Sequence, residues 1–187
     1  EVAEMRAMAE SRNARFRVDP AIFPCLDGNQ GPVEHRVPVE EAVAIELEDT
    51  RRLDSAAEYL ERARAIPPGD KLFNCGAGLT GFHVSPEGML QPCLMVGNHG
   101  FDLKSGTFRE GWDDTLRRFR EMEAPPGYEC NSCEQRFLCG VCPAQTSLET
   151  GSPVTTARYY CSLGRERERI IGTHAGPALP GRRTLEP

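Results

Sequence analysis

The chain has 187 residues, a formal net charge of −6 and a pI near 5.3. That length suits one ordinary domain or two small ones, and the acidic balance argues against a general nucleic-acid binder and against an anionic membrane surface as a partner. No apolar run reaches the length of about 18 residues that a membrane span needs, and the charged N-terminus lacks the apolar segment of a signal peptide, so we expect a cytoplasmic protein. The chain does not begin with Met, and we expect it to be a piece of a longer protein.

The first 70 residues are predicted to be mainly helical. A helix is expected over residues 3–14, followed by a short strand at residues 15–19, where apolar and polar side chains alternate. A proline suited to a first helical turn begins a helix over residues 38–48. Either Thr50 or Asp49 is expected to cap the next helix, which has regularly spaced leucines and alanines and ends before Pro67.

The second half has a hairpin and three helical segments. Residues 81–93 alternate, turn at a Pro-Glu-Gly sequence and alternate back, which predicts a β-hairpin. Residues 107–123 carry a capping-box pattern and an aromatic stripe that we interpret as core packing. Two short helices are expected over residues 143–149 and 157–171, and the Pro- and Gly-rich tail that follows is predicted to be disordered.

Seven of the eight cysteines lie between residues 75 and 161 and follow a regular spacing. The order is Cys75-x12-Gly88-x4-Cys93, then Cys130-x2-Cys133-x5-Cys139-x2-Cys142, then Cys161. Both sulfurs of a Cys-x2-Cys turn reach one metal centre together, and four thiolates are the usual requirement of one [4Fe–4S] cluster. Seven thiolates therefore suit two clusters, one with four protein sulfurs and one with three.

Zinc and disulfides are the alternative uses of these cysteines. Zinc ribbons separate their two Cys-x2-Cys pairs by well over five residues, and zinc does not explain a set of seven. Eight cysteines would suit the disulfides of a small secreted domain, but the chain has neither a secretion signal nor an Asn-x-Ser/Thr acceptor. Iron–sulfur clusters are therefore the favoured hypothesis, with zinc as the nearest rival.

A dinucleotide fingerprint, Gly-x-Gly-x-x-Gly, occurs at residues 76–81. Such a fingerprint binds a pyrophosphate only where a strand precedes it and a helix begins at it. Here a cysteine precedes it and a hairpin follows, so we interpret these glycines as backbone that passes close to whatever Cys75 binds.

The cysteine spacing resembles the SPASM domain, the auxiliary cluster-binding region at the C-terminus of many radical S-adenosylmethionine enzymes. The motif of that family is C-x9–15-G-x4-C, a gap, C-x2-C-x5-C-x3-C, a gap, and C. Residues 75–93 match its first half and residues 130–144 its second, with two residues instead of three between Cys139 and Cys142. The resemblance implies an α+β fold, in which a β-hairpin and short helices are stapled by iron–sulfur clusters over about residues 73–165.

By this resemblance the ligands of two auxiliary [4Fe–4S] clusters interleave along the chain. Auxiliary cluster II would be held by Cys130, Cys133, Cys139 and Cys161, and auxiliary cluster I by Cys75, Cys93 and Cys142. Each cluster would tie together segments distant in sequence and so stabilise a small core. Asp70 or an open iron site would complete the second set, and Cys25, far upstream, is expected to be an unligated thiol.

The resemblance also implies a division of the chain. Residues 1–36 would be the last helix and strand of a partial (β/α)6 barrel, residues 37–72 a helical linker, residues 73–165 the SPASM-like domain, and residues 166–187 the end of a helix and a tail. Radical S-adenosylmethionine enzymes bind their cofactor and a third [4Fe–4S] cluster through C-x3-C-x2-C, which is absent here. This chain alone is therefore not expected to cleave S-adenosylmethionine.

The full-length enzyme would modify a peptide or protein substrate, with the auxiliary clusters serving electron transfer or substrate binding. A small leader-peptide-binding partner and a reductant such as flavodoxin or ferredoxin are implied by the resemblance, and no nucleic acid or membrane. Two alternatives of other classes stay open: a stand-alone ferredoxin-like electron carrier, and a zinc-stapled interaction module.

Overall fold

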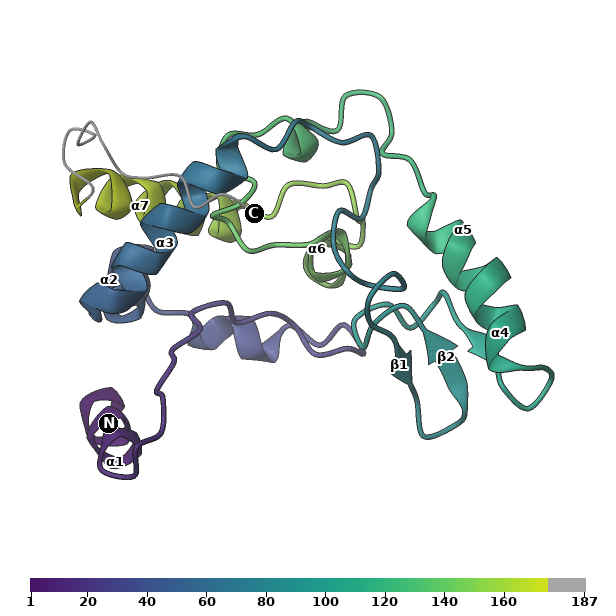
Figure 1. Ribbon diagram of the computed structural model, residues 1–187, viewed down its shortest axis with the longest axis horizontal. Helices are drawn as coiled ribbons and strands as arrows, with labels where there is room; N and C mark the ends of the chain where they lie inside the picture. Colours follow the sequence, from purple (N-terminus) through teal and green to yellow (C-terminus); the bar gives the residue numbers. More distant parts are fainter. Residues whose placement is uncertain (175–187) are drawn as a thin grey trace, which may run out of the picture.

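The computed structural model describes residues 1–174, and the predicted disordered tail lies outside these residues from position 175 onward. The described chain has the α+β class expected from the sequence, with helices and one small antiparallel sheet of strand order β1-β2-β3. In Figure 1 the sheet lies toward one end beside helices α4 and α5, while α2, α3 and α7 gather toward the other end. Helix α6 lies between these two parts.

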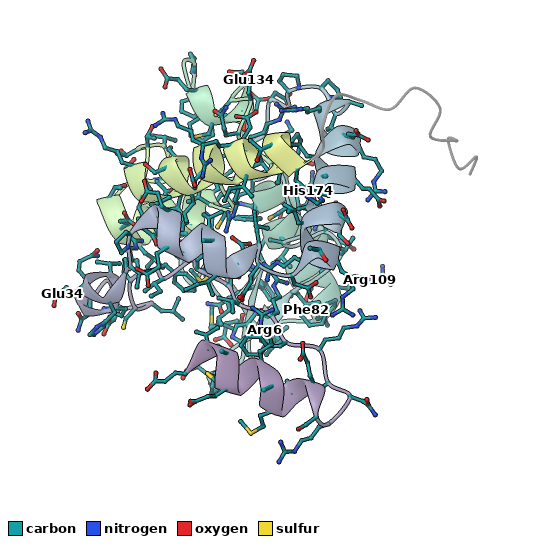
Figure 2. The ribbon with its side chains drawn as sticks, turned by 90° about the vertical axis from the view of Figure 1, so that its left-hand side faces the viewer. Arg6, Glu34, Phe82, Arg109, Glu134 and His174 are labelled. Carbon is teal, nitrogen blue, oxygen red and sulfur yellow. The ribbon has the colours of Figure 1, made fainter. Side chains whose placement is uncertain are left out.

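Helix α1 (Val2–Glu10) lies at the edge of the molecule and has no buried residue. Arg6, on the side of α1 that faces the body in Figure 2, forms an ion pair with Glu48 at 2.8 Å. The strand expected at residues 15–19 is not formed, so that prediction is wrong. Alternation favours an extended chain, but a strand also needs a neighbouring strand to pair with, and none lies beside this segment among residues 1–174.

Three helices build the larger of two hydrophobic cores. They are α2 (Val39–Glu46), α3 (Thr50–Arg64), which the Asp49 side chain caps as predicted, and α7 (Arg158–His174). Their buried side chains meet those of the cysteine-rich segment; the cluster comprises Ala42, Val43, Leu47, Leu53, Leu60, Leu138, Ala157, Tyr160, Leu163 and Ile171. The segment predicted as a helical linker thus packs against the helix that carries Cys161 and contributes to the core.

A mostly buried arginine ties the N-terminal segment to this core. Arg36 follows a 3-10 turn (Gly31–His35) and donates hydrogen bonds to the Ile22 carbonyl at 2.7 and 2.9 Å. The same guanidinium pairs with Glu149 of α6 at 2.6 Å and lies 3.3 Å from the Tyr160 hydroxyl of α7. One side chain therefore joins the N-terminal segment to both α6 and α7.

The predicted hairpin is formed, although its strands are short. Strands β1 (His83–Val84) and β2 (Met89–Gln91) pair antiparallel, and Gly88 adopts the left-handed φ of 91° in the turn. A third strand, β3 (Phe101–Asp102), pairs with β2 and was not predicted.

The predicted helix over residues 107–123 is formed in three parts. Its capping box joins Thr107 and Glu110 as expected, and α4 (Phe108–Glu110) and α5 (Arg117–Arg120) flank the π-helical segment Gly111–Leu116. Only the second half of the aromatic stripe is core: Phe119 is buried, whereas Phe108 is 43 % exposed. The interpretation of the stripe as core packing is therefore confirmed at Phe119 and wrong at Phe108, whose ring stacks with that of Trp112 beside solvent, with 5.7 Å between the ring centroids.

The smaller hydrophobic core includes a residue of α5 and contacts two of the cysteines. It is formed by Val96, Phe119 and Ala144, and Cys93 and Cys142 pack against it. Ala144 belongs to α6 (Pro143–Thr150). Among residues 1–174, every helix is too short or too polar to cross a lipid bilayer.

Candidate metal centre

The loop after Cys75 folds back onto the segment that leads into Cys93. The Gly78 N–H lies 2.8 Å from the Gly81 carbonyl and 3.0 Å from the Pro92 carbonyl. Gly78 has a left-handed φ of 67°, and a Cβ there would touch Pro92 and Leu116 at 3.5 and 3.6 Å. The glycines at residues 76–81 therefore allow the backbone after Cys75 to lie against the backbone that precedes Cys93, and no helix begins at this fingerprint.

The segment with four cysteines is a series of tight turns. A 3-10 turn (Glu129–Asn131) carries Cys130, and the next turn brings the Cys139 N–H to the Gln135 carbonyl at 3.0 Å. Gly140, with a φ of 71°, then redirects the chain, and Cys142 becomes the N-cap of α6. Cys139 thus packs against the larger core and Cys142 against the smaller one.

Helix α7 brings Cys161 to this segment, and a buried glycine makes the close approach possible. A Cβ on Gly164 would lie 3.1 to 3.2 Å from the backbone N, Cα and Cβ of Cys139. Gly164 is one helical turn after Cys161, so the contact between Gly164 and Cys139 also fixes how close Cys161 lies to Cys139. Sequence reasoning missed Gly164; the available signal was a glycine inside an otherwise regular amphipathic helix.

Four of the predicted ligands lie close enough to influence one another's ionisation. Burial is the largest cause of the raised pKa of Cys139, and a hydrogen bond with the Val141 backbone partly opposes it. Negative charge on Cys161, Cys130 and Cys133 raises this pKa further. Burial also raises the pKa of Cys161, with contributions from the charges of Cys130 and Cys133. We refer to Cys130, Cys133, Cys139 and Cys161 as the four-thiol group.

The remaining three predicted ligands form a second set, the three-thiol group Cys75, Cys93 and Cys142. The pKa of Cys142 is raised first by burial and then by negative charge on Cys75 and Cys93. Hydrogen bonds with the backbone of Gln145 and Ala144 oppose this shift. Both Cys93 and Cys142 also pack against the smaller core, which places them on one side of the domain independently of charge.

Tyr128 lies where the two groups come together. Its pKa is raised, first by burial and then by the charge of Cys130 and a hydrogen bond with the Cys130 side chain. Charges on Cys139 of one group and Cys142 of the other act on it as well. Tyr128 also lines a cavity of about 470 Å³ between residues 68–70 and 123–132.

All eight cysteines are free thiols. Among residues 1–174, no set of three or more His, Cys, Asp or Glu side chains converges closely enough to hold one metal ion. The two thiol groups are therefore sets of neighbours, not closed shells around a single ion. The donor set consists of soft thiolates, whose chemistry suits iron–sulfur clusters or zinc and not hard cations such as Mg²⁺ or Ca²⁺.

The other sequence candidates lie apart from these groups. Asp70, considered as a fourth ligand beside the three-thiol group, points to solvent with a 78 % exposed side chain and lies 3.8 Å from Lys71. Cys25 is exposed, and its N–H donates to the Asn29 carbonyl at 3.0 Å within a local turn.

Comparison with known protein families, with curated proteins and with solved structures finds no match to this chain.

Proposed function

We propose that this chain binds two [4Fe–4S] clusters, one in each thiol group, as the auxiliary-cluster region of a larger radical S-adenosylmethionine enzyme. The observation that carries the proposal is the division of seven thiols into two interleaved groups, which coincides with the partition implied by the SPASM resemblance. When bound, such clusters supply one-electron transfer or a Lewis-acidic iron for a substrate group.

The protein's own contribution is to hold the thiols at fixed positions and to supply hydrogen bonds. Backbone groups of Val141, Ala144 and Gln145 bond with thiols of both groups. Hydrogen bonds to sulfur favour the thiolate form that a metal requires and tune the reduction potential. The partly buried setting of six of the seven thiols limits access of water.

The second part of the proposal is that the chain belongs to a larger radical S-adenosylmethionine enzyme. A peptide or protein substrate, a leader-peptide-binding partner, an external reductant and a cytoplasmic location would belong to the full-length enzyme, along with S-adenosylmethionine and a third cluster. Reading the gene upstream of Glu1 tests this part: a C-x3-C-x2-C sequence supports it, and a complete reading frame without one overturns it.

Anaerobic reconstitution of the chain with iron and sulfide tests the cluster part. We expect a brown protein with broad absorbance at about 400 nm, as thiolate-bound [4Fe–4S] clusters give, and about eight irons and eight sulfides per chain. A protein that binds zinc tightly but takes up neither iron nor sulfide would refute the proposal and support the zinc-stapled module instead.

A further inference from the structure

The two thiol groups differ in the charge that they would place around a cluster. Three thiolates contribute one negative charge fewer than four. Since reduction adds a further negative charge, a less negative set of ligands makes reduction easier. Exposure acts in the same direction, because water stabilises the more highly charged reduced form, and Cys75 of the three-thiol group is the one exposed member of the seven.

The start of α6 adds a second difference. Cys142 is the N-cap of this eight-residue helix, and its sulfur accepts a hydrogen bond from the Gln145 N–H. The Gln145 side chain in turn accepts from the Cys142 N–H at 3.0 Å. The positive end of the helix dipole therefore faces a sulfur of the three-thiol group, where it stabilises added negative charge.

The four-thiol group has no helix start capped by a sulfur. Cys161 lies inside α7, and its N–H is directed to the Ala157 carbonyl at 3.4 Å. Its hydrogen bonds come from the Val141 backbone at Cys139, the Tyr128 side chain at Cys130 and the backbone at Cys161. Arg165 adds positive charge near Cys161, but its side chain is exposed, so water and salt screen that charge. The number of thiolates and the start of α6 therefore decide the difference.

We propose, on the basis of the function proposed above, that Cys75, Cys93 and Cys142 hold the cluster with the higher reduction potential. An electron delivered to this chain resides at the three-thiol group at equilibrium. The four-thiol group would then hold the cluster with the lower reduction potential.

Potentiometric titration of two ligand variants tests this order. The full 187-residue chain is reconstituted anaerobically, and reduction is followed by absorbance and electron paramagnetic resonance. Cys133→Ala should leave only the three-thiol step and Cys93→Ala only the four-thiol step. The step that remains in Cys133→Ala is expected to lie above the step that remains in Cys93→Ala; equal or reversed midpoints overturn the inference.

A third variant keeps all seven ligands and covers the case in which a cysteine variant fails to fold. Gln145→Glu retains an acceptor for the Cys142 N–H and adds a negative charge in the first turn of α6, which the helix dipole tolerates. At a fixed potential we expect the ratio of reduced to oxidised cluster in the three-thiol group to fall about tenfold, equivalent to a midpoint about 59 mV lower for one electron. The midpoint of the four-thiol group should stay unchanged.

A shift in the midpoint of the four-thiol group alone, or no shift in either midpoint, contradicts the assignment. The outcome also separates the two proposals. A chain that takes up no iron refutes the proposed function before any potential is measured, whereas an iron-loaded chain with the opposite order refutes only the inference drawn from α6.

Discussion

Replacing Cys133 with alanine should remove one cluster and loosen the fold around it. A cluster in the four-thiol group would cross-link Cys139 to Cys161 and close a loop of about 22 residues, for which chain entropy gives about 3 kcal/mol. In a domain of this size each kcal/mol corresponds to about 2–4 °C in Tm. Cys133→Ala should therefore lose about half of the bound iron and lower the Tm of the reconstituted chain by roughly 6–12 °C.

The assay compares iron, sulfide and thermal unfolding in Cys133→Ala and Cys25→Ala, both reconstituted under the same anaerobic conditions. Cys25 is exposed and lies outside both thiol groups, so its variant controls for the loss of a cysteine as such. It should keep the iron content and Tm of the unmodified chain. Should Cys25→Ala lose as much iron as Cys133→Ala, the assignment of the ligands to these two thiol groups is wrong.

Three further substitutions probe the scaffold that positions the thiols. Gly164→Ala places a methyl group 3.1 to 3.2 Å from Cys139, and it should lower the free energy of chemical unfolding by about 1–3 kcal/mol and reduce the bound iron. Its control, Gly172→Ala, places a methyl group in open space on the same helix and should raise that free energy by up to about 1 kcal/mol. Arg36→Ala should cost about 3–5 kcal/mol by the same measurement, because it leaves a mostly buried carboxylate without its partner; a cost under 1 kcal/mol would show that the clamp is not stabilising. Gly140→Ala and Gly151→Ala both force alanine to a left-handed φ and should each cost about 1–2 kcal/mol, but only the former should also reduce iron content.

Local sequence signals predicted the local structure well. The capping box at Thr107, the Asp49 cap and the Gly88 turn depend on residues within four positions of one another, and all three are formed. Features that depend on distant partners were less predictable. Strand β3 exists only because β2 lies beside it, and the segment at residues 15–19 has the alternation of a strand without a neighbour.

The candidate site shows the same contrast. Cysteine spacing predicted seven candidate ligands, because thiolate chemistry restricts the residue type. It did not indicate how the chain brings Cys161 against Cys139, which requires a glycine at position 164 and a helix packed on α2 and α3. Nor did it reveal that Tyr128 lies between the two thiol groups, because no motif marks this position.

The two thiol groups are joined by a short link, because two residues alone separate Cys139 from Cys142. Gly140, between them, has a left-handed φ; Cys139 lies against α7, while Cys142 caps α6. A link this short holds Cys139 and Cys142 at a fixed separation, so the fold around one group also helps to position a ligand candidate of the other. If both groups bind clusters, interleaved ligands would therefore let the binding of one cluster favour the binding of the other, while each group keeps its own ligands.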